Sequence, residues 1–155
     1  MKKTTSLFFF CVLISTTLFS QDVIRLQACN NMFIEKQADS IKQVVTKEGF
    51  SLLKESSITM ETEYEMPIVV PLQRGSLYHF VFIGEPGAKL YEVRMFDWGE
   101  NQVLQDNKTA KEGNIVAFSH VPEATELHSF RVLQSNKQKK KGLCGYVMLF
   151  KKTKA

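Results

Sequence analysis

The residues best suited to chemistry lie in one short polar segment, Asp97–Asn101 (DWGEN), which contains the only tryptophan of the chain. An exposed indole can stack on a sugar ring, while neighbouring carboxylate and amide groups bind the sugar hydroxyls. The segment therefore predicts a ligand-binding site formed by Trp98, Asp97 and Asn101. The alternative is that Trp98 turns back and caps the core beneath a tight turn, because indole side chains are usually substantially buried.

The same segment offers oxygen ligands for a metal ion. Asp97 and Asn101, together with Asp106, could hold calcium, although their spacing is not that of a helix–loop–helix calcium site. We therefore expect no cofactor, with calcium as the alternative.

Enzymatic chemistry has no candidate residues in this sequence. The histidines form no HxH or HExxH motif. His120 and His128 flank one loop and could meet across a hairpin, but a third metal ligand is not evident, and His79 stands in a predicted strand. There is no GxSxG motif and no glycine-rich phosphate loop, and the glutamates at 61–65 follow the alternation of an exposed strand face. The sequence predicts no catalytic residue, no metal site and no enzyme.

The first twenty residues have the three regions of a secretory signal peptide. Lys2 and Lys3 precede an apolar run at 7–14, and small and polar residues follow up to Ser20. The run is too short to cross a membrane, which takes about 20 apolar residues. We expect cleavage after Ser20, export to the periplasm or the cell exterior, no stable membrane insertion after processing, and a single domain over residues 21–155.

Loss of Lys2 and Lys3 with the signal would lower the formal net charge from +4 to +2, which does not indicate a nucleic-acid partner. The remaining excess of lysine is concentrated near the C-terminus, at 137–141 and 151–154. Such a cluster could bind an acidic partner or an anionic polysaccharide. The interpretation we favour is a solvated hairpin tip and a soluble tail that discourage edge pairing.

Two cysteines remain after removal of the signal, Cys29 and Cys144. In an oxidising compartment such a pair can form a disulfide that joins the N-terminal segment to a late strand. Closing so long a loop would contribute about 4–5 kcal/mol of stability in the chain-entropy model. The alternative is two separate buried thiols.

Apolar periodicity predicts the elements that position these residues. From about position 22 to position 48, apolar residues recur at steps of three and four, which predicts an amphipathic helix. Asn30 and Asn31 are a candidate interruption of this helix, and Gly49 could end it. From Ile58 to Leu72 every even position is apolar, which predicts a strand, or two strands bent at Pro67. Further strands are expected at 77–83, 90–96, 102–105, 115–119, 129–134 and 143–151, with a polar loop at 106–114.

Short strands without helical crossovers pair in antiparallel fashion. The sequence therefore predicts a mostly β protein, an antiparallel, jelly-roll-like β-sandwich with one N-terminal amphipathic α-helix packed across a sheet or an end.

Three segments carry a resemblance to a known class of module: PLQRGSLYHFVFIGE at 71–85, VRMFDWGENQV at 93–103 and VAFSHVPEATELHSFRV at 116–132. Their order resembles that of bacterial pre-peptidase C-terminal and related carbohydrate-binding-type β-sandwich modules. The resemblance implies a non-catalytic binding module, with a glycan or cell-surface polymer as the leading ligand. The alternative is an envelope structural or protein-interaction component that uses a strand edge or the helix as its contact.

Overall fold

The computed structural model describes residues 28–137 and 141–153, so the predicted signal peptide lies outside the described residues. Within these ranges the chain forms one helix and eight strands. They are α1 (Met32–Lys47), β1 (Phe50–Glu61), β2 (Met66–Leu72), β3 (Tyr78–Gly84), β4 (Leu90–Phe96), β5 (Gln102–Thr109), β6 (Ile115–His120), β7 (Glu126–Ser135) and β8 (Lys141–Lys152).

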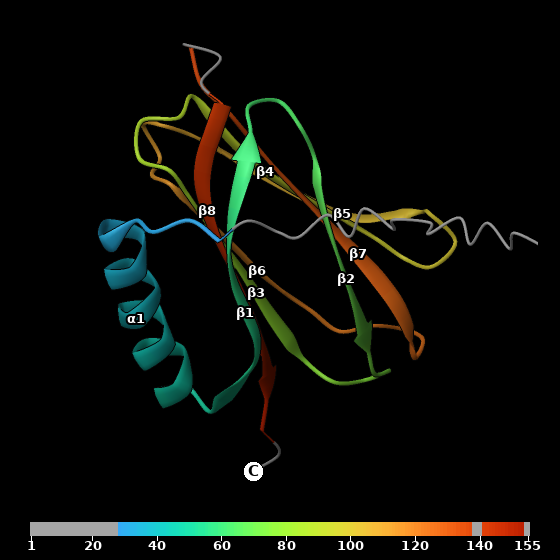
Figure 1. Ribbon diagram of the computed structural model, residues 1–155. Coiled ribbons are helices and arrows are strands. Elements are labelled where there is room, and N and C mark those ends of the chain that lie inside the picture. Colours follow the sequence, from blue (N-terminus) through green and yellow to red (C-terminus); the bar gives the residue numbers. More distant parts are fainter. Residues whose placement is uncertain (1–27, 138–140, 154–155) are drawn as a thin grey trace, which may run out of the picture.

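The strands form two four-stranded sheets that face each other, with orders β1-β8-β3-β6 and β2-β7-β4-β5 (Figure 1). Every pairing is antiparallel. The strands pair as β1 with β8, β2 with β7, β3 with β6 and β4 with β5, which is the arrangement of a jelly roll. The predicted mostly β, antiparallel sandwich with a helix is therefore confirmed.

The core lies between the sheets, where strand alternation brings apolar side chains of both layers together. Phe80 of β3 stacks on Phe130 of β7 with ring centroids 4.2 Å apart, so the two sheets meet through aromatic contact. Tyr91 and Val93 of β4 and Ile58 of β1 are also buried in this layer. The expected central strand at 77–83 is confirmed, because β3 is covered on one face by the opposite sheet and on the other by α1.

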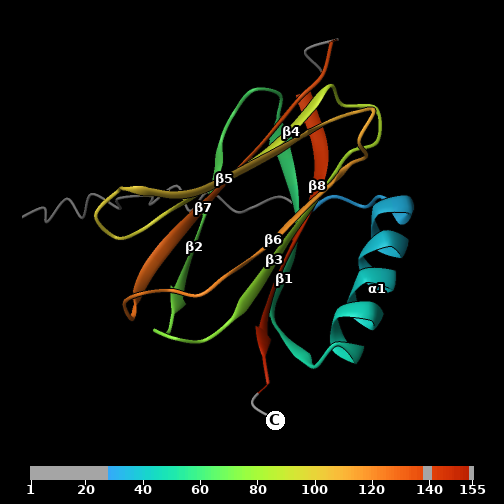
Figure 2. The same cartoon turned by 180° about the vertical axis from the view of Figure 1, so that it is seen from behind.

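Helix α1 lies along the outer face of the β1-β8-β3-β6 sheet, as the two opposite views show (Figures 1 and 2). It begins at Met32 because the Asn31 side chain accepts hydrogen bonds from the backbone N–H groups of Phe33 and Ile34. Residues 28–31 are not helical, which agrees with the interruption expected at Asn30 and Asn31 and corrects the prediction at residues 28 and 29, and residues 22–27 lie outside the described ranges. In the described part of the chain, no helix has the length and apolar character needed to span a membrane.

Two predicted boundaries in the strands need correction. The run from Ile58 to Leu72 breaks at residues 62–65, where Glu63 adopts a positive φ of 65°, rather than at Pro67. Pro67 instead lies inside β2, an edge strand whose sequence also includes Pro71. Strand β5 continues to Thr109 through residues expected to be a loop, because an edge strand in contact with water accepts polar side chains.

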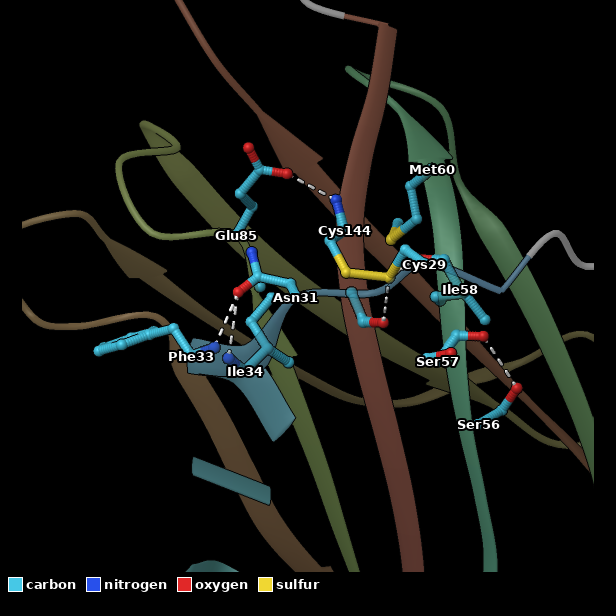
Figure 3. The surroundings of a disulfide bond; sticks show 12 residues. Cys29, Asn31, Phe33, Ile34, Ser56, Ser57, Ile58, Met60, Glu85 and Cys144 are labelled. Atoms are coloured by element: carbon cyan, nitrogen blue, oxygen red, sulfur yellow. Dashed lines mark hydrogen bonds between the residues drawn. A yellow bond between two sulfur atoms is a disulfide. The ribbon is translucent and has the colours of Figure 1, made fainter. Parts of the chain in front are cut away.

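A disulfide joins Cys29 to Cys144, with Cα atoms 5.7 Å apart (Figure 3). It links the segment before α1 to β8, so the alternative of two separate thiols is wrong. Cys144 is buried in the cluster between α1 and the sheet, together with Ile34 of the helix and Met148 of β8. The bond therefore fixes the chain next to the point where α1 begins.

Candidate ligand-binding site

The β4–β5 turn determines the position of Trp98. The turn is closed by backbone hydrogen bonds in which the Asp97 N–H donates to the Asn101 carbonyl (3.0 Å) and the Glu100 N–H donates to the Asp97 carbonyl (3.2 Å). Glu100 adopts a left-handed φ of 60°, which tightens the turn. Trp98 lies at its tip and is 67% exposed, so the alternative in which it caps the core is wrong.

A hollow of about 330 Å³ lies beside the indole, on the outer face of the sheet that contains β2, β7 and β4. Its apolar wall is formed by Val69 of β2 and Leu127 of β7, which are 52% and 39% exposed. Ser129 and Arg131 of β7 supply polar groups at the same face. The hollow thus combines an aromatic platform, an apolar wall and several hydrogen-bonding groups.

Arg131 holds the charged end of the hollow in place. Its guanidinium lies 4.1 Å from the centre of the Phe96 ring and forms an ion pair with Glu100. A stacked, paired arginine is preorganised, because little side-chain entropy remains to be lost when a ligand binds. Next to it on β4, Arg94 forms ion pairs with Glu65 and, at 2.9 Å, with Glu92.

Asp97 and Asn101 have different roles. The Asn101 backbone N–H donates to Asp97 Oδ1 at 2.8 Å, and its side-chain amide donates to both Asp97 oxygens at 3.2 and 3.0 Å. These hydrogen bonds lower the pKa of Asp97 below its ordinary value, so the carboxylate is ionised. Asp97 and Trp98 line the hollow, whereas the Asn101 amide is directed at Asp97 and stabilises the turn. Of the three residues proposed from sequence, two therefore line the hollow and the third supports them.

The two histidines expected to approach each other do so. The rings of His120 in β6 and His128 in β7 have centroids 6.0 Å apart, and His128 is buried against the hollow. Burial lowers the pKa of His120, and the electrostatic effect of the neighbouring His128 ring lowers it further. No group of three His, Cys, Asp or Glu side chains suited to a metal ion occurs within residues 28–137 and 141–153. Asp106, the other proposed calcium ligand, lies opposite Val93, about 10 Å along the strand from the end of β4.

Sequence reasoning missed the residues that β2 and β7 contribute. Val69, Leu127 and Arg131 lie more than 25 residues from Trp98 and reach it only through the pairing of β2 with β7 and of β7 with β4. A signal was present at Val69, an apolar residue at a position of the Ile58–Leu72 alternation that faces water. An exposed apolar side chain on an otherwise wet sheet face is a feature of binding surfaces.

Neither a protein-family model nor a curated protein matches this sequence. Among solved structures, the fold is similar to a CBM4 structure, with 12% identity, 66% of this chain and 74% of that chain covered, and a TM-score of 0.39. It is also similar to the K1 and K3 cleaved adhesin domains of Lys-gingipain from Porphyromonas gingivalis W83. Both domains are 14% identical to this chain. The K1 match covers 65% of this chain and 75% of that domain with a TM-score of 0.43, and the K3 match covers 64% of this chain and 74% of that domain with a TM-score of 0.41.

The expected weak resemblance to carbohydrate-binding-type sandwich modules is consistent with these matches. At such identities and TM-scores they carry no argument about a ligand or partner, and the fold class rests on the two sheets themselves.

Proposed function

We propose that this protein is an exported, non-catalytic binding module whose hollow beside Trp98 holds a glycan or another cell-surface polymer. The observation that carries the proposal is an indole that is 67% exposed at the edge of a hollow with polar groups around it. Leaving so large an apolar surface in water is unfavourable, so such a side chain commonly marks a contact surface.

The chemistry of the hollow suits a sugar. The face of the indole can stack on the C–H groups of a pyranose ring, and Asp97 and Ser129 can bind its hydroxyls. The hydrogen bonds of the turn and the Arg131–Glu100 ion pair support the platform before any ligand arrives. Binding then costs little ordering of the protein, which favours affinity.

The size of the hollow favours a short stretch of a polymer. Ligand pockets usually enclose ~300–1,000 Å³, and this hollow of about 330 Å³ is at the small end of that range. A polymer that contacts the site through one or two units, with the remainder in solvent, fits this volume. No cofactor and no nucleic acid belong to the proposal.

Export is part of the proposal and is supported by the Cys29–Cys144 disulfide, since such bonds persist in oxidising compartments. The proposal includes a signal peptide at residues 1–20 and a mature domain over residues 21–155. Mass spectrometry of the protein purified from whole cells tests it, because an unprocessed N-terminus would contradict export.

The glycan site is tested by Trp98→Ala on a glycan array. We expect binding to be lost while the circular dichroism spectrum and melting temperature stay unchanged, because the exposed indole contributes little to the core. Trp98→Phe should retain part of the binding through its smaller aromatic face. Tyr64→Ala is the matched control, since Tyr64 is an equally exposed aromatic side chain in another turn. Array binding that survives Trp98→Ala would refute the proposal.

A second candidate function is protein interaction through α1. Phe33 is 56% exposed and lines an apolar hollow of about 310 Å³ with Ile41 of the helix and Ile115 of β6. Cross-linking in intact cells distinguishes the two functions. A protein partner that is lost with Phe33→Ala and kept with Trp98→Ala would favour the second.

A further inference from the structure

A larger hollow, of about 940 Å³, lies at the opposite end of β4 from Trp98. Its described lining comes from the β3–β4 turn, from the β5–β6 turn and from residues 135–137 and 143 at the facing ends of β7 and β8, whereas Trp98 lies in the β4–β5 turn. We propose that this hollow is a second binding site, which takes an anion with an apolar body such as a long-chain carboxylate. This proposal goes beyond the glycan site and does not depend on it.

The charge of the lining points to an anion. Three lysines line the hollow: Lys89 of the β3–β4 turn, Lys111 of the β5–β6 turn and Lys137, two residues after the end of β7. In the parts of the chain that the structure describes, no carboxylate lies within ion-pair distance of their ammonium groups. The acid in the lining is Glu85, whose Oε2 accepts a hydrogen bond from the Cys144 backbone N–H at 2.7 Å (Figure 3). The excess of cations gives the hollow a positive potential.

The remaining lining points to an apolar body. Ala88 and Leu143 are both 2% exposed and form a buried floor, and Leu90 and Pro86 continue it toward the surface. The described lining residues include no aromatic side chain, so the hollow lacks the stacking platform that a nucleobase or a sugar ring would use. An apolar floor with ammonium groups around it suits an alkyl chain that ends in a carboxylate or sulfonate.

Backbone hydrogen bonds join the β3–β4 turn to the ends of β5 and β7 and so preform the site. The Lys89 N–H donates to the Ser135 carbonyl at 2.6 Å, and the Lys89 carbonyl accepts from the Ala110 N–H at 3.2 Å. Lys89 is therefore fixed between β5 and β7. The β3–β4 turn is itself rigid, since Pro86 is followed by Gly87 at a φ of 90°. A ligand can enter without rearrangement of the backbone.

The test uses two fluorescent dyes and the full mature chain. Anilinonaphthalene sulfonate is an apolar anion, and N-phenylnaphthylamine is its uncharged counterpart. We expect saturable binding of one equivalent of the sulfonate and about tenfold weaker binding of the neutral dye, since exposed ion pairs each contribute about a factor of two to three. Dodecanoate should displace the sulfonate dye, and acetate at the same concentration should not. Equal affinity for the two dyes would overturn the charge argument.

Four variants locate the binding. Lys89→Gln/Lys111→Gln/Lys137→Gln should weaken sulfonate binding about tenfold, whereas Lys36→Gln/Lys47→Gln/Lys54→Gln, which removes the same charge from α1 and β1, should leave it unchanged. Ala110→Trp places an indole in the hollow from an exposed turn residue and should abolish binding of both dyes. Equal losses in the two triple variants, or full affinity in Ala110→Trp, would overturn the proposal. Trp98→Ala should leave dye binding intact, which separates this site from the glycan site.

Discussion

Loss of the Cys29–Cys144 disulfide should remove a large share of the stability of the domain. The two cysteines are 115 residues apart. In the chain-entropy relation, closing a loop of this length lowers the entropy of the unfolded chain by about 16 cal/mol/K, which corresponds to about 5 kcal/mol at 25 °C. Domains of this kind typically have a free energy of unfolding of ~5–15 kcal/mol. We therefore expect the double variant Cys29→Ala/Cys144→Ala to lose about a third to nearly all of that free energy.

The loss should have a local component at the start of α1. Cys29 lies two residues before Asn31, the residue that caps the helix, and Cys144 lies beneath the helix in β8. Without the bond, the first turn of α1 keeps the Asn31 cap and the contact of Ile34 with the sheet but loses its covalent link to β8. Amide hydrogen exchange in residues 32–36 should therefore accelerate more than exchange in β3 or β7.

Urea unfolding measures the effect. The wild-type protein with reductant should lose as much free energy of unfolding as the double variant, and its m-value should increase because the unfolded chain expands without the cross-link. Reductant should have no effect on the double variant, which serves as the control. A loss below about 1 kcal/mol with an unchanged m-value would refute the reasoning, because the unfolded chain would then not be constrained by the bond.

Four further outcomes follow from the structure. Gly84→Ala should destabilise the domain by ~1–3 kcal/mol, because a Cβ there would lie 2.3 Å from Cδ1 of Tyr91. Asn31→Ala should cost about 1 kcal/mol of unfolding free energy through loss of the helix cap. The pKa values of His79 and His120 are lowered below 6.5, in both cases chiefly by burial. The unfolded chain therefore binds protons more readily, and stability should fall as the pH drops from 7.5 through about 6.5. Addition of EDTA should leave glycan binding unchanged, because no group of three His, Cys, Asp or Glu side chains suited to a metal ion occurs among the residues that the structure describes.

Each of these outcomes has its own check. Gly84→Ala should cost less in a Tyr91→Leu background, which removes the clashing ring, and equal costs would contradict the steric explanation. Asn30→Ala, in the neighbouring exposed residue, should leave the melting temperature unchanged. Melting temperatures at pH 7.5 and 5.5 should differ less when both histidines are replaced by glutamine. Glycan binding that disappears with EDTA and returns with calcium would favour the calcium alternative.

Much of the fold could be predicted because its main signals are local. Alternation from Ile58 predicted strands, and the apolar run at 77–83 predicted the strand that is buried on both faces. The even number of cysteines predicted a bond that does form. The start of the helix was misplaced because apolar spacing continues before Asn31, whereas the helix begins where the Asn31 side chain binds the free N–H groups. The end of β5 was misplaced because the polar residues from 106 onward were interpreted as a loop, whereas the backbone of residues 106–109 pairs with β4.

The site could be predicted only in part. The composition of the DWGEN segment marked Trp98 as a candidate, but the direction of the indole depends on the left-handed Glu100 and on the hydrogen bonds between Asp97 and Asn101. The walls of the hollow come from β2 and β7. These strands lie beside Trp98 because of the strand order of the sheet, which could not be predicted from the sequence. The lysine-lined hollow depends in the same way on the β3–β4 and β5–β6 turns meeting the end of β7 at one end of the sandwich.

The prolines of β2 bear on how this protein behaves when many copies are close together. This edge strand is apolar, and a free apolar edge ordinarily invites a neighbouring chain to add its own strand. In a strand, the backbone N–H groups of alternate residues point to the same side, so positions 67, 69 and 71 share one side of β2. Two of these residues are prolines, and only Val69 carries an N–H group. A copy that approached β2 would find too few donors to extend the sheet. We therefore expect crowded molecules to stay separate along this edge, which leaves the face beside Trp98 open to solvent.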